Sequence, residues 1–552
     1  MRDAYDVVVV GSGFGGAIVA CRLAQAGRSV AVLERGKRWA GSDFPRSIGE
    51  VGADAFWEEG RSHGFLEYAA FRNVDVIQGA GVGGGSLHYF NVNLPADERI
   101  FADRRWPAAI TREVLDPYYE VARGMLGSAP LAPPPERSAL PPRTTAFIEA
   151  SRRAGLAAEL VPIAVHATAA RARPATGLAQ NPCNYSGNCL FGCDIGAKNT
   201  LDLNYLALAE HRHGAEILPL HVVESIAPSA EGGYQVRFRR LDPDPAQPAS
   251  AGTVRAAVVV LAAGALGSTG LLLHCRDRGN TLPKLSRALG THFSLNGEFL
   301  FALAHGTASR ADPGIGPPIT ARATVASSSG ALITVEDLGL PDQLLWYLEG
   351  TMPPPLGRIG GLAALAAAYL KRMLGLGSRT SRLSLELDAI LAGARTPHTI
   401  PYLGMATDSS DGELSLRDGA LELTWSVARN RALYREIEGV MRQISEAAGG
   451  RFATSFLYRW PMRKLLTAHP LGGCTMGDDE STSVVNDRGE VWGHPGLYVV
   501  DGSMIPTALA VNPSLTIAAL AERAAFWMVN GQEMVAGEAE TPGRQKVTRE
   551  VD

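Results

Sequence analysis

Residues 6–34 read DVVVVGSGFGGAIVACRLAQAGRSVAVLE, and this stretch decides the fold. Its first part, 6–10, is a short β-branched run that ends in glycines, the pattern of a buried parallel strand. Residues 16–26 then have the apolar spacing of a helix, and 29–33 form a second apolar strand that ends in Glu34. A strand, a helix and a second strand in this order predict a βαβ unit at the start of the chain.

The glycines between the first strand and the helix have the spacing G-x-G-x-x-G at Gly11, Gly13 and Gly16. We expect Gly11 to permit a tight turn, Gly13 to let the backbone approach a pyrophosphate, and Gly16 to let the helix pack closely on the strand. The N-terminus of the helix would face the negative charge of the phosphates. Glu34 ends the second strand, where a carboxylate can accept hydrogen bonds from both ribose hydroxyls. Together these features predict a dinucleotide site rather than a structural glycine turn.

The composition is that of a soluble enzyme without a nucleic-acid partner. The chain has 552 residues, more than one hydrophobic core usually supports, so we expect two domains. The net charge of −4 leaves no excess of basic residues to neutralise phosphates. The longest apolar run, 359–370, is shorter than the roughly 20 residues of a membrane span, and the first residues lack the pattern of a secretory signal. We therefore expect a cytoplasmic protein, in which this run could contact a membrane surface.

Two later segments are predicted to return to the sheet that the first strands begin. Residues 257–263 and 497–500 are continuous apolar runs, and each is followed by a helical pattern, at 268–274 and at 514–527. A nucleotide-binding domain built from separated stretches accounts for this arrangement. We expect that domain to comprise residues 1–42, 72–95, 200–292 and 465–535, with 43–71, 96–199 and 293–464 forming a substrate-binding domain and 537–552 a polar tail.

The inserted material differs in pattern from the nucleotide-binding segments. Residues 233–239 and 413–424 alternate polar and apolar side chains, and an Asp-Gly pair at 418–419 is placed to turn the second segment into a hairpin. We expect these antiparallel strands to form a substrate-domain sheet with one covered face. Residues 127–145 and 241–252 are rich in Pro and Ala, which predicts surface connections.

A second glycine cluster distinguishes between NAD and FAD as the cofactor. Residues 79–86 read GAGVGGGS, and so many small residues leave room for a long, folded cofactor against the backbone. Asp501 and Gly502 end another buried strand, where a carboxylate can reach a ribityl chain or a pyrophosphate. Contacts spread so widely along the chain favour FAD. The residues expected to contact it are Gly11, Gly13, Phe14, Gly15, Gly16, Glu34, Gly84, Gly85, Ser86, His88, Val223, Asp501 and Gly502.

Four segments resemble the glucose–methanol–choline (GMC) oxidoreductase family, and most closely its cholesterol oxidase-like branch. They are the N-terminal glycine motif, GAGVGGGS at 79–86, HPLGGCTMG at 469–477 and DGSMIPTALAVNPSLTIAALAER at 501–523. The resemblance implies an α/β fold, α+β overall, in which a Rossmann-like FAD-binding domain carries an inserted antiparallel-sheet substrate domain. It also implies bound FAD and the oxidation of a CH–OH group.

Alcohol oxidation by a flavin requires hydride delivery to the flavin N5 atom and removal of the hydroxyl proton. His469 can take that proton, because imidazole titrates nearest to neutral pH. Asn512 can hydrogen-bond the same oxygen, and the resemblance implies that these two residues form the family's pair over the flavin. Glu336, in ITVEDLGLP, resembles the carboxylate with which cholesterol oxidases move a steroid double bond. A solvated surface acid is the alternative, and Asp337 beside it competes for the role.

His88 and a cluster of cysteines carry alternatives that the sequence leaves open. His88 lies where some family members bond a histidine to the flavin 8α-methyl group, and a noncovalent histidine near the flavin ring is the alternative. Cys183, Cys189 and Cys193 lie close together in sequence, and three thiolates could hold a [3Fe–4S] cluster or a zinc. A disulfide or plain packing is commoner in such a glycine-rich loop, so we predict no metal site.

The apolar, helix-prone segment 359–374 is either a buried core helix or a lid that seals the flavin from water. A lid of this composition fits a large apolar substrate. We therefore predict FAD-dependent oxidation of a lipophilic, steroid-like alcohol to the ketone or aldehyde, with O2 or a redox carrier as electron acceptor and with double-bond isomerisation as a further step. The alternatives are a redox-silent FAD lyase, a dehydrogenase of sugars or aliphatic alcohols, and a non-catalytic FAD-binding scaffold. Oxidase and dehydrogenase are not distinguished, and no oligomeric state is predicted.

Overall fold

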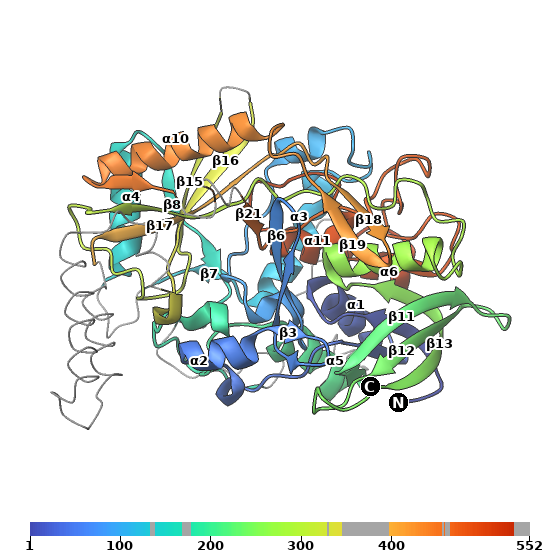
Figure 1. Ribbon diagram of the computed structural model, residues 1–552. Helices are drawn as coiled ribbons and strands as arrows, with labels where there is room; N and C mark the ends of the chain where they lie inside the picture. Colours follow the sequence, from blue (N-terminus) through green and yellow to red (C-terminus); the bar gives the residue numbers. More distant parts are fainter. Residues whose placement is uncertain are drawn as a thin grey trace, which may run out of the picture.

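Two large sheets organise the chain (Figure 1). The computed structural model describes residues 1–132, 139–167, 178–327, 330–344, 397–454, 458 and 464–534. The sheet that contains the N-terminal strands lies at the lower right of Figure 1, and the second sheet lies at the upper left, beneath α10. The predicted lid segment 359–374 and the tail 537–552 lie outside the described residues.

The first sheet grows from the predicted βαβ unit. Strand β1 (Ala4–Val10) pairs in parallel with β2 (Val30–Leu33) across the helix α1 (Phe14–Gln25), and on its other side in parallel with β13 (Ser250–Leu261). Every residue of β2 is buried, as the apolar run predicts. The remaining strands are β10 (Glu216–Leu218), parallel to β2, β22 (Leu497–Val499), parallel to β13, and the antiparallel strands β12 (Tyr234–Arg240) and β11 (His221–Pro228).

Strand β12 corrects the expectation for residues 233–239. The segment is an antiparallel strand, but its partners are β11 and β13, so it extends the nucleotide-binding sheet and not a substrate-domain sheet. The reason is the length of β13, whose first half pairs with β12 while its second half pairs with β1. Residues 241–252 are therefore not wholly a surface connection, because β13 begins at Ser250.

The hairpin predicted at 413–424 forms, but it also stands apart from the substrate-domain sheet. Strands β18 (Glu413–Arg417) and β19 (Ala420–Thr424) pair only with each other among the described strands, and Asp418 at the turn has a positive φ of 52°. The hairpin packs on helix α6 (Gly264–Asp277), which covers its apolar side chains. Because the helix already buries that face, the hairpin does not need further strands.

The second sheet is antiparallel throughout, as the family resemblance implies. Its order is β20 (Arg451–Ala453), β14 (Phe299–His305), β17 (Thr399–Ala406), β16 (Leu332–Asp337), β15 (Ala321–Ala326) and β8 (Ala158–Leu160). Helices α10 (Arg431–Ala447) and α4 (Pro142–Arg153) pack on it. The expectation of one covered face is wrong for the central strands, because β16 and β17 are buried at every position.

A small third sheet brings two predicted motifs together. Strand β6 (Val74–Gly79) leads into the second glycine cluster, and β21 (Leu465–Thr467) leads into the segment that contains His469. The two strands are parallel, with β5 (Leu66–Ala70) antiparallel on the outer side of β6. Because parallel strands end at the same edge of a sheet, the glycine cluster and His469 follow at one edge.

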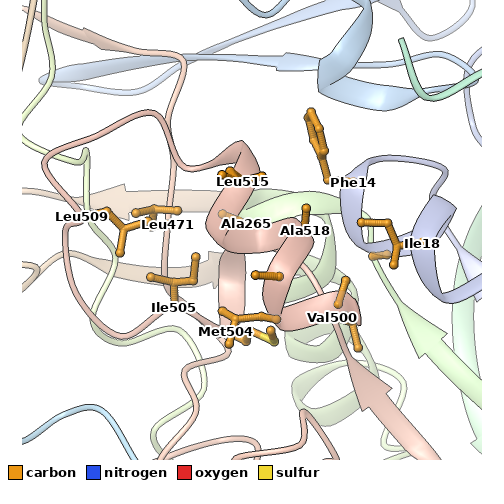
Figure 2. Close-up of a cluster of buried hydrophobic side chains, with 14 of the residues drawn as sticks. Phe14, Ile18, Ala265, Leu471, Val500, Met504, Ile505, Leu509, Leu515 and Ala518 are labelled. Carbon is orange, nitrogen blue, oxygen red and sulfur yellow. The ribbon is translucent and has the colours of Figure 1, made fainter. Parts of the chain in front are cut away.

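The C-terminal motif segments and the N-terminal helix share one core. Figure 2 shows Phe14 and Ile18 of α1 gathered with Ala265 of α6, Leu515 and Ala518 of α11 (Ser514–Asn530), and side chains of the segments around 471 and 500–509. The same helix α1 packs on α5 (Tyr205–His213), and α11 packs on α3 (Arg112–Leu126). This shared core holds the glycine motif and the residues before α11 in a fixed relation.

The remaining elements are short. They are η1 (Gly41–Asp43), α2 (Ile48–Glu50), η2 (Val51–Ala55), β3 (Trp57–Glu58), β4 (Ser62–His63), η3 (Gly84–Leu87), η4 (Glu98–Ala102), β7 (Ala129–Pro130), β9 (Pro162–Ile163), η5 (Asn188–Phe191), η6 (Leu201–Leu203), η7 (Asp342–Leu344) and η9 (Gly502–Met504). Part of the expected connection 127–145 is helical, because α4 begins at Pro142 and buries Arg143. In the part of the chain that the structure describes, no helix has the length and apolar composition to cross a membrane. The domain boundaries stay a prediction.

Candidate active site

One cavity of about 380 Å³ joins the segments that the sequence marked as functional. That volume falls in the range of small-molecule sites. The cavity extends along the turn after β1, the end of β2, the second glycine cluster, β11, the start of α6 and the segments before η9 and α11. The predicted contact residues that line it are Gly11, Gly13, Phe14, Gly15, Glu34, Gly84, Gly85, His88, Val223, Asp501 and Gly502.

The turn between β1 and α1 has the geometry of a phosphate cradle. Gly11 has a φ of +95°, a conformation that a side chain would strain, so the tight turn requires glycine. A Cβ at Gly15 would lie 1.5 Å from the Val500 carbonyl oxygen, so α1 approaches the end of β22 closely. Among the described residues, no side chain caps the N-terminus of α1 at Gly13, where a Cβ would meet nothing within 4 Å. The N–H groups of the first helical turn are thus free for an anion, which fits the pyrophosphate of FAD.

Two predicted contact residues hold the loops from outside the cavity. Gly16 packs on the backbone of Gly11, which agrees with its expected role in helix–strand packing. The hydroxyl of Ser86 donates to the Gly83 carbonyl oxygen at 2.7 Å and accepts from the Leu201 N–H at 3.0 Å. Neither residue lines the cavity, so the structure places both behind it.

Glu34 lies at the end of β2 and lines the cavity, as predicted for a ribose-binding acid. One carboxylate oxygen accepts from the Ser12 N–H at 3.0 Å and the Ser12 hydroxyl at 2.6 Å, and the other accepts from the Gly36 N–H at 2.9 Å. The Ser12 hydroxyl oxygen also accepts from the Gly83 N–H at 3.0 Å, which ties the two glycine loops together. Burial raises the pKa of Glu34, although these bonds oppose the shift. The oxygen that accepts only from Gly36 keeps capacity for a further donor such as a ribose hydroxyl.

Asp501 lines the cavity, but protein donors already occupy its carboxylate. It accepts from the Ser268 hydroxyl at 2.5 Å and the Gly264 N–H at 2.9 Å, and on its other oxygen from the Ser503 N–H at 2.8 Å and hydroxyl at 2.5 Å. These bonds join the start of α6 to η9. In this geometry Asp501 holds the backbone around Gly502 in place, and its contact with a ribityl chain or a pyrophosphate stays a prediction.

Val223 lines the cavity next to a bulge in β11, between Val223 and Ser225. The neighbouring His221 also lines it, and the sequence reasoning missed that residue. The His221 ring packs on Phe238 with 5.1 Å between ring centroids, and its Nδ1 lies 2.7 Å from the Pro219 carbonyl oxygen. A lone histidine at the start of an alternating strand carries no pattern that marks it for a cofactor.

His469 and Asn512 line the same cavity although they are far apart in sequence. His469 follows β21, and Asn512 precedes α11. The Asn512 amide nitrogen donates to Glu336 at 3.2 Å, and the Asn512 amide oxygen has no hydrogen-bond partner among the described residues. The structure therefore brings His469 and Asn512 into one cavity, where the Asn512 amide oxygen can bind a ligand.

Glu336 lies behind Asn512 and does not line the cavity. It is fully buried on β16, so the alternative of a solvated surface acid is wrong. Burial raises the pKa of Glu336 to about 8, with smaller contributions in the same direction from Asp337 and Glu298. The strand alternation separates Glu336 from Asp337, whose carboxylate accepts from Arg143 of α4 at 3.0 Å on the opposite face.

Comparison with known proteins identifies the family. A family model described as GMC oxidoreductase matches residues 15–292, and a second model of the same description matches residues 392–521. This chain belongs to the GMC oxidoreductase family. A cholesterol oxidase of Mycobacterium tuberculosis (strain CDC 1551 / Oshkosh) is 32% identical, over 96% of this chain and 92% of its own length. A cholesterol oxidase of Acinetobacter baumannii is 27% identical, over 94% and 93%.

The fold of this GMC oxidoreductase is shared with a solved structure as well. The crystal structure of pyridoxine 4-oxidase from Mesorbium loti aligns with a TM-score of 0.59 at 17% identity and covers 94% of this chain and 98% of its own. These comparisons confirm the predicted family, fold class and cofactor. The protein is an FAD-dependent oxidoreductase whose oxidase relatives act on alcohols.

The sequence reasoning missed Glu298 in this GMC oxidoreductase. Glu298 lines the cavity, is 1% exposed, and has one carboxylate oxygen 3.4 Å from the His469 Nδ1. It comes directly before β14, where FLFALA forms an apolar run. A single acid at the edge of such a run is a weak signal of a buried, paired carboxylate.

His88 of the GMC oxidoreductase also faces the cavity. Its Nε2 is buried without a hydrogen-bond partner in the described residues. Burial lowers the pKa of His88 to about 3, and the charges of Lys198 and His469 act in the same direction. The ring is therefore neutral at physiological pH, with a nitrogen open to a neighbouring group. A noncovalent histidine beside the flavin ring stays the prediction for His88, with covalent attachment as the alternative.

The three clustered cysteines of the GMC oxidoreductase sit in hydrogen-bonded loops. Cys189 accepts from the Asn91 amide, and Cys193 from the Lys198 N–H, both at 3.4 Å. No disulfide joins the chain's six cysteines, so that alternative is wrong. Within the described ranges, no three or more His, Cys, Asp or Glu side chains are arranged so that they could hold a metal. The contacts of Cys183, Cys189 and Cys193 are those of a packed loop.

Proposed function

We propose that this GMC oxidoreductase oxidises a lipophilic, steroid-like alcohol to the ketone or aldehyde. The observation that carries the proposal is the meeting of His469 and Asn512 in one cavity with the glycine cradle. Bound FAD would accept the hydride of the carbinol carbon at its N5 atom. The protein's own residues then have to hold the substrate oxygen, take its proton and keep water away.

His469 and Asn512 divide the work on the substrate hydroxyl. One amide proton of Asn512 goes to Glu336, so the second amide proton and the amide oxygen are left for the substrate. His469 accepts the hydroxyl proton as the carbon–hydrogen bond breaks. A general base of this kind is worth about 10²–10⁴-fold in rate.

The apolar side chains that share the cavity support a lipophilic substrate. Leu300 and Phe301 of β14 line it beside Glu298, and Phe90 lines it after the second glycine cluster. Phe301 has a positive φ of 63° at a bulge in β14, and bulges of this kind redirect side chains near active sites. The relatives described as cholesterol oxidases act, by that name, on a sterol. We propose O2 as the electron acceptor because these relatives are described as oxidases.

We also propose that Glu336 carries the isomerisation of a steroid double bond. Burial raises the pKa of Glu336 to about 8, so its ionised form is a stronger base than an ordinary carboxylate. In that form it can take a proton from one substrate carbon and return it to another, which moves the double bond without net gain or loss of protons. Asn512 stands between Glu336 and the cavity, and its amide has to turn aside for that step. A 5-ene-3β-hydroxysteroid tests the idea, because Glu336→Gln should then release the unconjugated ketone.

Anaerobic mixing with a panel of alcohols tests the main proposal. The panel contains 3-hydroxysteroids, long-chain aliphatic alcohols and sugars, and the flavin absorbance is followed in each. Bleaching by the steroids, with a higher kcat/KM than for the other two classes, is the expected result. A preference for sugars contradicts the lipophilic assignment, and unbleached flavin with product formed indicates the lyase alternative. Repeating the turnover with O2 and with a dye separates an oxidase from a dehydrogenase.

A further inference from the structure

Glu298 is held beside His469 by three hydrogen-bond donors of the histidine's own segment. Its Oε2 accepts from the Thr467 hydroxyl at 2.7 Å, the Ala468 N–H at 2.7 Å and the His469 N–H at 3.1 Å. Three donors on one oxygen leave the other, Oε1, pointing toward the imidazole. Oε1 lies 3.4 Å from the His469 Nδ1. The His469 Nδ1 is buried and has no hydrogen-bond partner among the described residues, so it approaches Oε1 without a formed hydrogen bond.

We propose that Glu298 is a positioning residue that sets the tautomer of His469. It holds the ring proton on Nδ1 and so leaves the lone pair of Nε2 for the substrate hydroxyl. The inference rests on the proposed role of His469 as proton acceptor. A carboxylate only accepts hydrogen bonds, so of the two neutral tautomers only the one protonated on Nδ1 can bond to it.

The distance of 3.4 Å is longer than the roughly 2.7–3.2 Å of an N–H···O hydrogen bond, so the bond is not formed in this structure. Bonds of catalytic histidines are often loose without substrate and tighten when it binds. Because Oε2 is tied by three bonds, the carboxylate can turn little, and a small rotation of the imidazole closes the contact. The fixed carboxylate thus orients the ring as well as choosing its tautomer.

A purely structural role for Glu298 makes a different prediction about substitutions. Glu298→Gln keeps the length and retains a carbonyl oxygen for the Ala468 and His469 N–H groups. It places an amide N–H2 at the Nδ1 side, which favours the opposite tautomer with the proton on Nε2. Glu298→Asp keeps an acceptor-only group but shortens the reach to the backbone. Tautomer control therefore predicts that Gln is the worse replacement, and a structural cap predicts that Asp is.

Asp408 supplies a matched control. It is buried and accepts from the Leu295 and Gly297 N–H groups and from Ser294, so it braces the same loop that carries Glu298. It does not line the cavity, and its hydrogen bonds within the described chain go to residues 294–297 and to Ser410. Asp408→Asn removes a carboxylate from the loop, so any effect that it shares with Glu298→Gln is structural.

The first experiment is nitrogen NMR of the holoenzyme with 15N-labelled histidine. The signals of His469 are assigned by their loss in His469→Asn. We expect the neutral ring of the wild type and of Asp408→Asn to be protonated on Nδ1, and that of Glu298→Gln on Nε2. A wild-type ring protonated on Nε2, or the same tautomer in the wild type and Glu298→Gln, overturns the inference. The wild-type spectrum decides even if a variant fails to fold.

The second experiment is the rate of flavin reduction at saturating alcohol, mixed without oxygen. Loss of the correct tautomer should slow Glu298→Gln by about 10²–10⁴-fold while substrate KM changes little. Glu298→Asp should lose less, and Asp408→Asn should reduce its flavin at the wild-type rate. A Glu298→Gln rate equal to that of the wild type, or an Asp variant slower than the Gln variant, contradicts tautomer control.

The two proposals fail in different ways. If His469→Ala reduces its flavin as fast as the wild type, His469 is not the proton acceptor, and the inference about Glu298 is wrong with it. If no alcohol bleaches the flavin of the wild type, the proposed function itself is wrong, whatever the tautomer. If His469→Ala is inactive but Glu298→Gln is not, the proposed function stands and the inference about Glu298 is wrong.

Discussion

The two ends of the cavity are built from different parts of the polypeptide. At the nucleotide end the contacts come from backbone: the Gly11 turn, the free N-terminus of α1 and a second glycine loop. At the alcohol end they come from side chains, His469 and Asn512, each backed by a buried carboxylate. A backbone cradle depends on residues that are adjacent in sequence. A side-chain constellation depends on how separate segments pack, so the two ends should respond differently to substitution.

Removing the imidazole of His469 should have the largest effect, and that effect should be on the rate of flavin reduction. His469→Ala takes away the proposed proton acceptor and should slow flavin reduction by about 10²–10⁴-fold, because no other cavity side chain replaces it. The cradle is untouched, so FAD content should equal that of the wild type. Stopped-flow absorbance measures the rate of flavin reduction, and the flavin-to-protein ratio measures the FAD content. A loss of FAD in this variant would show that the two ends are not independent.

Substitution of Asp337 tests whether Glu336 and Asp337, which are neighbours on β16, have different roles because their side chains lie on opposite faces of the sheet. Asp337→Asn leaves the fully buried Arg143 without its counter-ion and should lower the free energy of unfolding by about 3–5 kcal/mol. Because Asp337 faces α4, flavin reduction per folded molecule should not change. Denaturant unfolding and stopped-flow rates check both statements, and a slowed reduction would place Asp337 in the site.

Adding a methyl group to the glycine turn, in Gly15→Ala, should weaken cofactor binding. The Cβ of Gly15→Ala would lie 1.5 Å from the Val500 carbonyl oxygen, a backbone atom that cannot turn aside. We expect a loss of FAD content and of about 1–3 kcal/mol in unfolding free energy. Gly124→Ala, in α3 with nothing within 4 Å of the new atom, is the control and should be neutral or slightly stabilising. Wild-type FAD content in Gly15→Ala would contradict the close approach.

Glu336 should make stability depend on pH. Its pKa is raised from its ordinary value to about 8, so the folded protein holds a proton that the unfolded chain releases above about pH 4.5. The stabilisation from this proton is complete below that pH and is lost as the pH rises to about 8, at up to about 1.4 kcal/mol per pH unit. Unfolding of the wild type and Glu336→Gln, compared from pH 5 to 8, should show this slope only in the wild type. Parallel curves would contradict the raised pKa.

The sequence predictions succeeded where a feature has a local sequence pattern and failed where it depends on how distant segments pack. The βαβ unit and its glycine spacing were predicted because a strand, a turn and a helix leave local patterns. The same local patterns misplaced β12 and the hairpin of β18 and β19, because alternation indicates a strand but not its partner. Partner choice depended on the length of β13 and on the helix α6 that covers the hairpin.

The site residues also show what sequence motifs can and cannot predict. His469 and Asn512 were found through motifs that resemble a family, and the structure brings them into one cavity. Glu298 carries no motif, and its place beside His469 depends on the pairing of β14 with β17 and β20 and on β21 next to β6. Asp501 was predicted to contact the cofactor, but no motif indicated the four protein donors that its carboxylate binds.

The sequence by itself predicted the cofactor cradle, the family and the proposed catalytic pair, because each is carried by short motifs of contiguous residues. Only the tertiary structure decided what stands behind that pair. Burial of Glu336 and Glu298 in the packed core raises the pKa of Glu336 and brings Glu298 to the His469 ring. Desolvation and contact between distant segments have no local pattern, so they are visible only once the chain is folded.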